Sequence, residues 1–240
     1  MDIAIISGGS RGIGMAIAKL LDQKSLDEIW IISRSKNTSY SFSTPIRHLS
    51  LDMTNSAFTE NVGSALCKNE YCIKYLVCSA GVGYSGKVAE LSEEEIERTV
   101  SLNCTALSLL TRICIHYMKK GSSIIEIASG AGFLPQPSFS VYAASKSYVI
   151  SFSRALRQEL KKSDINVTCV CPGPVDTDFF STLDAPEYKK KYLISAEKVA
   201  KGALSASHKN KAIYSPTLSI KAVHLISKIL PTNLIMKFYK

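Results

Sequence analysis

The sequence predicts an α/β protein, in which a doubly wound parallel sheet has helices on both faces. Short apolar runs alternate with segments whose apolar residues recur at helical spacing, and this alternation is typical of βαβ units. Several runs, such as Ile29 to Ile32, are apolar at consecutive positions, as strands covered on both sides require. A glycine-rich turn separates the first strand-like run from the first helical segment.

The expected elements follow one another regularly along the chain. Strands are expected over residues 2–7, 28–33, 46–51, 73–79, 123–128, 165–171 and 212–215. Helices are expected over residues 12–23, 92–119, 141–162, 195–207 and 218–230. The second of these helices begins with a capping box, because Ser92 can accept a hydrogen bond from the Glu95 amide while the Glu95 side chain reaches back. Pro231 ends the last helix.

The length and composition favour one globular domain. The chain has 240 residues, of which 46% are hydrophobic and 20% charged, an ordinary globular composition. It contains no internal repeat, linker or low-complexity segment. We expect a single domain over residues 1–240, within which residues 178–240 form a substrate loop and a basic C-terminal extension.

The net charge of +9 is concentrated at one end of the chain. Residues 1–184 carry 18 basic and 18 acidic side chains, whereas residues 185–240 carry 11 lysines and only two acids, Glu187 and Glu197. A basic balance raises nucleic acid or a membrane surface as a partner. The basic end lacks arginine, and its aromatic residues follow an apolar pattern, so we expect no nucleic-acid partner.

Signals for targeting, disulfides and metals are absent from the sequence. The chain opens with an acid at position 2 and a short apolar run, unlike a signal peptide. The seven cysteines are an odd number without a Cys-x-x-Cys motif, so we expect a reducing, cytoplasmic location. The four histidines have no ligand spacing, and no metal site is expected.

The glycine-rich turn has the composition of a phosphate-binding turn. Gly8, Gly12 and Gly14 lie between an expected strand and an expected helix. A dinucleotide pyrophosphate must approach the backbone closely, and a helix N-terminus offers unpaired amides and positive potential. Side chains at these positions would block that approach.

A second group of motifs indicates acid–base chemistry. Tyr142 and Lys146 lie four residues apart on a helix, so the phenol and the ammonium share one face. A nearby cation stabilises a phenolate and brings the tyrosine pKa closer to working pH. Ser129 lies 13 residues upstream of Tyr142, just past a strand, and Asn103 lies on the long helix.

In order and spacing, these motifs resemble the short-chain dehydrogenase/reductase family over roughly residues 2–180. The family pattern Thr-Gly-x-x-x-Gly-x-Gly is present with Ser7 in place of the threonine. Residues 78–81, Cys-Ser-Ala-Gly, stand where the family usually has Asn-Asn-Ala-Gly, and the Pro-Gly-Pro run at 172–174 follows the expected strand. The resemblance implies a Rossmann-like fold and hydride transfer between a nicotinamide cofactor and a small carbonyl or alcohol.

The resemblance also implies a role for each catalytic residue. Tyr142 would donate or accept the proton at the substrate oxygen. Lys146 would lower the tyrosine pKa and hold the nicotinamide ribose. Ser129 would hydrogen-bond the substrate carbonyl and the developing oxyanion, and Asn103 would hold a water that links Lys146 to solvent.

The implied cofactor site draws on the glycine turn and on several strand ends. Val175 and Thr177 would contact the nicotinamide carboxamide, and Asp52 would lie against the adenine. The full implied set is Gly8, Ser10, Arg11, Gly12, Ile13, Gly14, Arg34, Asp52, Met53, Ala80, Gly81, Tyr142, Lys146, Pro172, Gly173, Val175 and Thr177.

Two arginines favour NADP(H) over NAD(H). An acid at the end of the second strand binds the ribose hydroxyls of NAD, but Arg34 occupies that place. Arg11 lies in the glycine turn, which faces the same region. Guanidinium groups favour the additional phosphate of NADP.

The segment after the Pro-Gly turn is where the family carries its substrate loop. Phe179, Phe180, Leu183 and Tyr188 could line an apolar pocket, which favours a lipophilic substrate. The run of three lysines at 189–191 is expected to be a solvated charge run.

The C-terminal helix over residues 218–230 leaves three interpretations open. It could pack on its own substrate cleft or a partner subunit, contact a membrane surface peripherally, or do neither. We expect a homodimer or homotetramer, since family members usually pair through the helices that carry Asn103 and Tyr142. The alternative to an enzyme is a non-catalytic dinucleotide-binding sensor or scaffold on the same fold.

Overall fold

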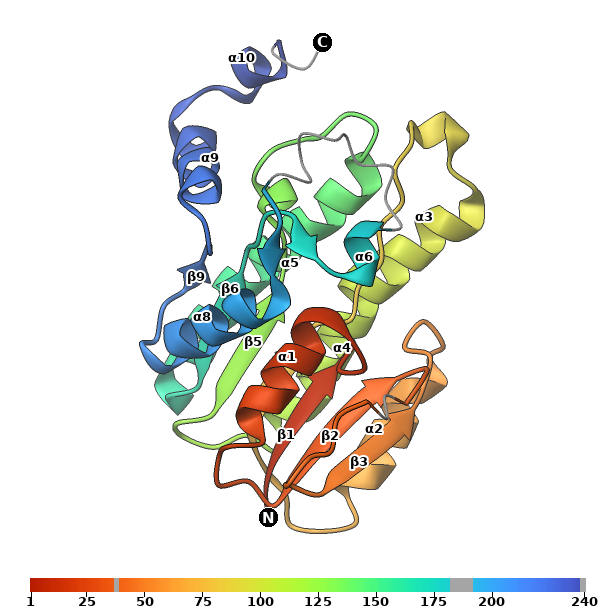
Figure 1. Cartoon of the computed structure of the whole chain (residues 1–240), viewed down its shortest axis with the longest axis vertical. Coiled ribbons are helices and arrows are strands. Elements are labelled where there is room, and N and C mark those ends of the chain that lie inside the picture. Colours follow the sequence, from red (N-terminus) through yellow and green to blue (C-terminus); the bar gives the residue numbers. More distant parts are fainter. Residues whose placement is uncertain (37–38, 182–191, 238–240) are drawn as a thin grey trace.

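A sheet of parallel strands forms the centre of the molecule. The computed structural model describes residues 1–36, 39–181 and 192–237. Within these residues the main sheet has seven strands in the order β3-β2-β1-β4-β5-β6-β9, paired in parallel throughout (Figure 1). The strands are β1 (Asp2–Ser7), β2 (Glu28–Ser33), β3 (Ile46–Ser50), β4 (Cys72–Cys78), β5 (Ser123–Ile127), β6 (Asn166–Val170) and β9 (Ile213–Tyr214).

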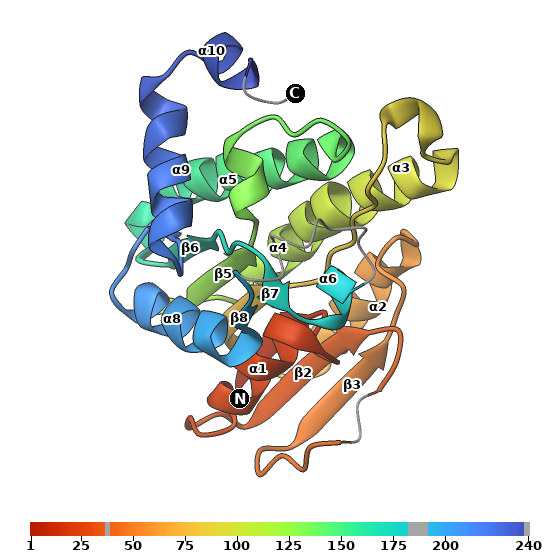
Figure 2. The same cartoon turned by 45° about the horizontal axis from the view of Figure 1, so that its top comes forward.

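Helices cover both faces of this sheet, as expected. Helices α1 (Gly12–Leu21) and α8 (Ala196–His208) pack on one face, and α2 (Ala57–Leu66), α4 (Leu107–Ile115) and α5 (Ser140–Glu159) pack on the other (Figures 1 and 2). The side chains of β1 explain the two layers. Ile3 and Ile5 belong to the core with α2, α4 and α5, and Ala4 and Ile6 belong to the core with α1, since successive strand residues point to opposite faces. The expected doubly wound sheet is confirmed.

The long helix expected over residues 92–119 is interrupted. It consists of α3 (Glu93–Val100), a π-helical stretch over Ser101–Ala106, and α4. Its start has the expected capping box, in which the Ser92 Oγ accepts from the Glu95 amide at 3.2 Å and the Ser92 amide donates to Glu95 Oε2 at 2.9 Å. The irregular stretch carries Asn103.

Helix α2 was not expected from the sequence. Its buried residues Phe58, Val62 and Leu66 recur every four positions, and the Asn55 side chain accepts a hydrogen bond from the Ala57 amide at 3.0 Å. Both signals are weak in a short segment that is otherwise polar, and contact with the sheet core is what stabilises it.

Several short elements that follow β6 lie outside the main sheet. Two short strands, β7 (Val175–Asp176) and β8 (Ile194–Ser195), pair with each other, and α6 (Asp178–Ser181) follows β7. Helices α9 (Leu218–Ile229) and α10 (Thr232–Met236) come last, and in both views they extend away from the sheet (Figures 1 and 2). Among the described residues, no helix combines the length and apolar character needed to cross a membrane.

Candidate active site

A pocket of about 700 Å³ lies at the carboxyl ends of the central strands. Every residue of the expected cofactor and catalytic set lines it except Gly14 and Asn103. In an open parallel sheet this end is where ligands bind. The pocket also includes Phe179, which was expected to line an apolar pocket, and residues that the sequence did not single out, among them Lys36 and Arg98.

The glycine turn is shaped by close backbone contacts. Gly8 has a φ of +67°, and a Cβ on it would lie 2.7 Å from the backbone nitrogen of Ala80. A Cβ on Gly14 would overlap the carbonyl oxygen of Gly8. Gly14 therefore lets α1 pack against the turn and does not line the pocket, and its expected contact with the cofactor stays a prediction.

The N-terminus of α1 opens onto this turn. Arg11 occupies the N-cap position in an extended conformation and makes no side-chain hydrogen bond to the helix amides. The first backbone N–H groups of α1 are therefore available to donate hydrogen bonds to a ligand.

Tyr142 and Lys146 lie on the buried face of α5. Their side chains are 7% and 5% exposed, and the Lys146 Nζ lies 5.7 Å from the centre of the Tyr142 ring. Nζ donates a hydrogen bond to the backbone carbonyl of Ile127, the last residue of β5, at 2.9 Å. Helix α5 and β5 therefore bring Ser129, Tyr142 and Lys146 to the same end of the pocket.

Burial dominates the pKa values of this pair. It raises the pKa of Tyr142 to about 12, and the hydrogen bond with Ser129 acts in the opposite direction. Burial lowers the pKa of Lys146 to about 8, since a low-dielectric site disfavours the charged form. At neutral pH the phenol therefore carries its proton.

Asn103 is placed behind the pocket and not in its wall. It is fully buried. Its Oδ1 accepts from the Val82 amide at 2.9 Å, and its Nδ2 donates to the Val82 carbonyl at 2.8 Å and to the Ser145 Oγ at 2.9 Å. A Cβ on Gly81 would lie 3.2 Å from Asn103 Oδ1 and 3.3 Å from Lys146 Nζ, so both side chains approach that glycine from the same side.

Aromatic side chains surround Tyr142. The ring of Phe139 stacks on it with centroids 4.4 Å apart, and the ring of Phe179, at the start of α6, lies 5.6 Å away. Phe180 follows on α6. Leu183, Tyr188 and the lysines at 189–191 lie outside the described residues.

The other end of the pocket is cationic. Arg34 and Lys36 follow β2, and Arg98 comes from α3. Asp52 also lies there, where it accepts hydrogen bonds from the Thr54 amide and hydroxyl at 3.0 and 2.8 Å and pairs with Arg98 at 3.3 Å. These hydrogen bonds and the charges of the two arginines outweigh desolvation and lower the pKa of Asp52.

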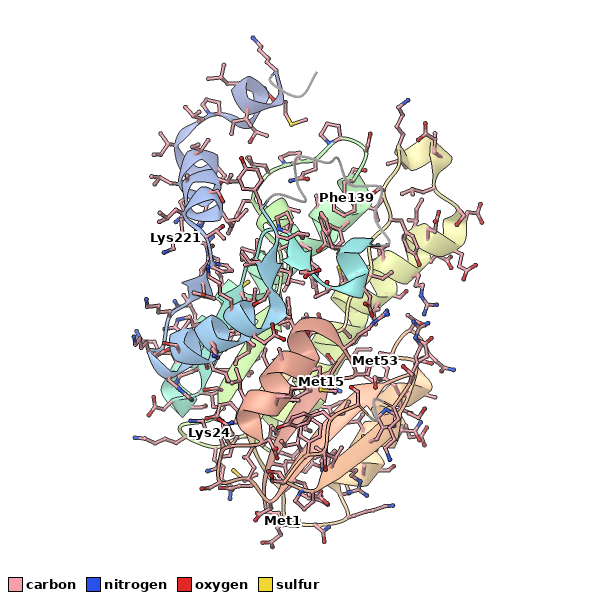
Figure 3. All side chains as sticks on the ribbon, viewed as in Figure 1. Met1, Met15, Lys24, Met53, Phe139 and Lys221 are labelled. Carbon is pink, nitrogen blue, oxygen red and sulfur yellow. The ribbon has the colours of Figure 1, made fainter. Side chains whose placement is uncertain are left out.

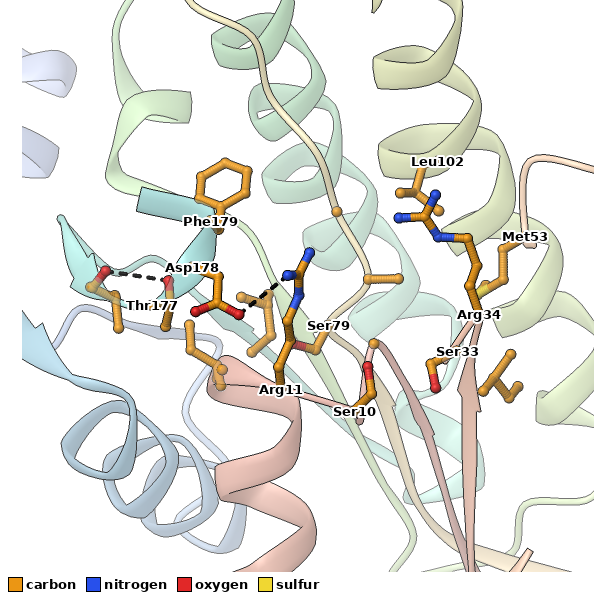
Figure 4. A pocket seen from close by; sticks show the side chains of 18 of the residues that line it. Ser10, Arg11, Ser33, Arg34, Met53, Ser79, Leu102, Thr177, Asp178 and Phe179 are labelled. Atoms are coloured by element: carbon orange, nitrogen blue, oxygen red, sulfur yellow. Dashed lines mark hydrogen bonds and ion pairs between the residues drawn. The ribbon is translucent and has the colours of Figure 1, made fainter. Parts of the chain in front are cut away.

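Arg11 and Arg34 do not act as a pair in this structure. The Arg11 guanidinium forms an ion pair with Asp178 at 3.2 Å, whereas Arg34 points toward Met53 and Leu102 (Figure 4). The sequence singled out both arginines for one phosphate. Asp178 lies after the Pro-Gly turn, and its contact with Arg11 forms only in the folded chain.

The pocket fits a nicotinamide dinucleotide. Gly8 and Gly12, both with positive φ, form part of one wall. Cations line one end, and a partly buried Ser129 with the buried Tyr142 and Lys146 lines the other. This combination of a doubly wound sheet and pocket defines a dinucleotide-binding protein of the Rossmann-like class.

Comparison with known proteins narrows this class. Residues 2–187 match the sequence profile of the short chain dehydrogenases. Carbonyl reductase family member 4 of Xenopus laevis is 33% identical over 193 residues, which cover 78% of this chain and 81% of that protein. The chain therefore belongs to the short-chain dehydrogenase/reductase family of oxidoreductases, which act on small molecules.

Solved structures share the fold. A short-chain dehydrogenase from Sphingobium yanoikuyae in complex with NADPH has a TM-score of 0.79 and 25% identity, with 92% of this chain and 90% of that chain covered. A 4-hydroxyisoleucine dehydrogenase complexed with NADH has a TM-score of 0.77 and 21% identity, with 90% and 96% covered.

Proposed function

We propose that this protein is an NADP(H)-dependent oxidoreductase that interconverts a carbonyl and an alcohol, with Tyr142 as the acid and base. The observation that carries the proposal is the meeting of Ser129, Tyr142 and Lys146 at one end of a pocket whose other end is cationic. When bound, the cofactor supplies or accepts the hydride. The chain's own residues orient the substrate and move the proton.

The Tyr142 hydroxyl donates its proton to the substrate oxygen during reduction and takes it back during oxidation. A phenol with a pKa of about 12 holds its proton at neutral pH and is a far stronger acid than the alkanol it forms. The buried site is therefore suited to proton donation, the reduction direction. Lys146, when charged, stabilises the phenolate that donation leaves behind.

Ser129 and Asn103 have separate tasks in this mechanism. The Ser129 hydroxyl hydrogen-bonds the substrate carbonyl, so it is a preorganised donor to the oxygen that gains negative charge. Asn103 is a positioning residue. Its hydrogen bonds to Val82 and Ser145 tie α5 and the loop after β4 together around Lys146.

The preference for NADP(H) rests on the end of β2. Arg34 stands where an acid would bind the ribose hydroxyls of NAD, and Lys36 and Arg98 add positive charge to that end of the pocket. The Asp52 carboxylate is already paired with Arg98. Arg34 and Lys36 are then the side chains proposed to hold a 2′-phosphate.

The substrate is proposed to be a lipophilic carbonyl compound. Phe139 and Phe179 flank Tyr142, so a substrate that reaches the phenol hydroxyl meets apolar rings. A comparable reaction is implied by the name of the Xenopus laevis carbonyl reductase. We also propose that the subunits form a homodimer or homotetramer.

The decisive experiment follows NADPH oxidation by the purified full chain over ketosteroids, aldehydes, quinones and 3-oxoacyl thioesters. Tyr142→Phe is expected to lower turnover of an accepted substrate by at least about a hundredfold, the scale of general acid catalysis. NADPH binding, measured by fluorescence titration, should remain. Tyr148→Phe is the matched control, because Tyr148 lies on the same helix, is 43% exposed and bonds Ser108 at 2.8 Å.

A different outcome would support a non-catalytic sensor or scaffold. NADPH would then bind, no carbonyl would be turned over, and Tyr142→Phe would behave like Tyr148→Phe. Failure to bind either nicotinamide dinucleotide would contradict both functions.

A further inference from the structure

An apolar stripe runs along the outside of α9. Leu218, Ala222, Leu225 and Ile229 recur at i, i+4, i+7 and i+11 and therefore lie on one face of the helix. We call these four residues the outer stripe. The side chains of Leu218, Leu225 and Ile229 are 81%, 59% and 67% exposed, which is unusual for three large apolar residues on one helix face.

The opposite face of α9 attaches the helix to the rest of the protein. Ile220 packs over two glycines, since a Cβ on Gly130 would lie 2.8 Å from its Cδ1 and a Cβ on Gly173 would lie 3.2 Å from its Cγ1. The His224 ring stacks on Phe133 with centroids 4.2 Å apart and planes 11° apart. Because these contacts orient the helix, the outer stripe faces away from the protein.

Lysines border the outer stripe, and the segment of the chain that carries it contains no acid. On a helical wheel Lys221 and Lys228 lie along one edge of the stripe, and both are exposed. Residues 198–240 contain eight lysines and not one Asp or Glu. The surface thus combines an apolar face with positive charge.

Helix α10 continues this surface. Leu230, in the link between the helices, is 40% exposed, and Leu234 is 43% exposed. Lys237 follows directly and is also exposed. Both views show α9 and α10 together at one extremity of the molecule (Figures 1 and 2).

From this geometry we infer that α9 and α10 dock the protein on the surface of a membrane that contains anionic lipids. Apolar side chains on one helix face enter the boundary between headgroups and acyl chains, and flanking lysines bind anionic headgroups. A second copy of the chain is a poorer occupant. A two-fold contact places the same surface on both partners, so lysines without acids would face each other.

The test uses flotation of the full-length protein with two kinds of vesicle. One contains phosphatidylglycerol in phosphatidylcholine, and the other contains phosphatidylcholine alone. Wild-type protein is expected to float with the anionic vesicles and far less with the neutral ones. Raised salt should weaken binding, because screening shortens the reach of the lysine charges.

Paired variants separate the two components of the surface. Leu225→Ser/Ile229→Ser is expected to abolish flotation, and Val88→Ser, at a 54% exposed apolar residue elsewhere, should not. Lys221→Ala/Lys228→Ala should weaken partition about thirtyfold, from the contribution of each lysine near an anionic surface. Lys24→Ala/Lys68→Ala is its control, and Figure 3 shows Lys24 far from Lys221.

Several results would overturn the inference. Absence of flotation with anionic vesicles would do so, as would equal flotation of the stripe variant and its control. Size-exclusion chromatography with light scattering tests whether a second copy of the chain binds the outer stripe instead. If Leu225→Ser/Ile229→Ser splits an oligomer and the wild type ignores vesicles, the stripe is a subunit interface. Because flotation needs neither cofactor nor turnover, its outcome is independent of the proposed function.

Discussion

Asn103 pairs with the backbone of Val82 through both atoms of its side-chain amide, at 2.9 and 2.8 Å. The contact has the donor and acceptor pattern of a strand pair, but it joins a π-helical stretch to the loop after β4. A third hydrogen bond reaches the Ser145 Oγ, which itself donates to the Tyr142 carbonyl at 2.7 Å. One buried amide thus connects three segments that surround the candidate active site.

Replacing Asn103 should destabilise the protein. In Asn103→Ala the Val82 amide and carbonyl lose their buried partners, and stranded buried groups cost more than the lost bond alone. The free energy of unfolding should fall by about 2–4 kcal/mol, as measured by urea denaturation. Asn61→Ala is the control, because Asn61 is exposed and its side chain makes one bond within α2. Equal stabilities for the two variants would contradict the assigned contacts.

Lys146 should set the alkaline limit of catalysis. Its pKa is lowered to about 8 by burial, so the ammonium loses its proton as the pH rises through this value. The Tyr142 hydroxyl, with a pKa of about 12, still holds its proton there. The kcat/KM for carbonyl reduction should therefore fall above about pH 8. A kcat/KM that stays constant up to pH 10 would contradict a role for the Lys146 charge in the reaction.

Glu126 should make stability depend on pH. It is fully buried on β5, and among the described residues its Oε1 has no hydrogen-bond partner. Burial raises its pKa from 4.5 to about 7, and the nearby Ser153 and Thr111 hydroxyls act in the opposite direction. The single Ser153 hydroxyl proton cannot serve both Glu126 and the Val149 carbonyl, and a protonated Glu126 that donates to Ser153 removes this conflict.

The raised pKa of Glu126 makes the folded protein more stable at low pH than at high pH. Between pH 4.5 and 7 the folded state holds the Glu126 proton more tightly than the unfolded state does, so this stabilisation is present below pH 4.5 and lost as the pH rises through about 7. The loss is about 3 kcal/mol, from 1.36 kcal/mol per pKa unit. Glu126→Gln should remove it and exceed wild-type stability at pH 8 in urea titrations. Glu94→Gln, on exposed α3 surface, should leave it intact.

Arg34 should decide between the two nicotinamide cofactors. If its guanidinium binds the 2′-phosphate, Arg34→Ala raises the KM for NADPH at least about tenfold, the loss of one charge-assisted hydrogen bond, and leaves the KM for NADH nearly unchanged. Arg112→Ala, at an exposed position on α4, should alter neither. A wild-type preference for NADH would refute NADP(H) specificity.

Replacing each of two helical glycines with alanine should have opposite effects on the stability of the protein. In Gly14→Ala the new Cβ overlaps the Gly8 carbonyl, so the turn must move and both stability and dinucleotide affinity should fall. Gly63 in α2 has no atom within 4 Å of the same position, so Gly63→Ala should stabilise the protein by about 0.5–1 kcal/mol. Thermal melts with and without NADPH measure both effects. A Gly14→Ala variant as stable as Gly63→Ala would contradict the packing of α1.

The sequence determined the parallel sheet and most of the pocket. Strand-like apolar runs and glycine spacing are local signals, because a two-sided sheet needs consecutive apolar residues and a phosphate-binding turn needs bare backbone. These signals predicted Gly8. The helical spacing of Tyr142 and Lys146 and the resemblance to the short-chain family predicted Ser129, Tyr142 and Lys146. The sequence did not predict helix α2, because its apolar residues are few and are stabilised by the core rather than by their neighbours in sequence.

Only the tertiary structure decided how side chains from distant segments are paired. Arg98 pairs with Asp52, and Arg11 with Asp178, across separations that no local pattern encodes. Burial of Tyr142 and Lys146 gave each a pKa that spacing alone could not predict. The outer stripe of α9 became an exposed surface because Ile220 and His224, on the opposite face, pack against the loops after β5 and β6. Local chemistry is read from neighbouring residues, whereas burial and pairing depend on which elements the fold brings into contact.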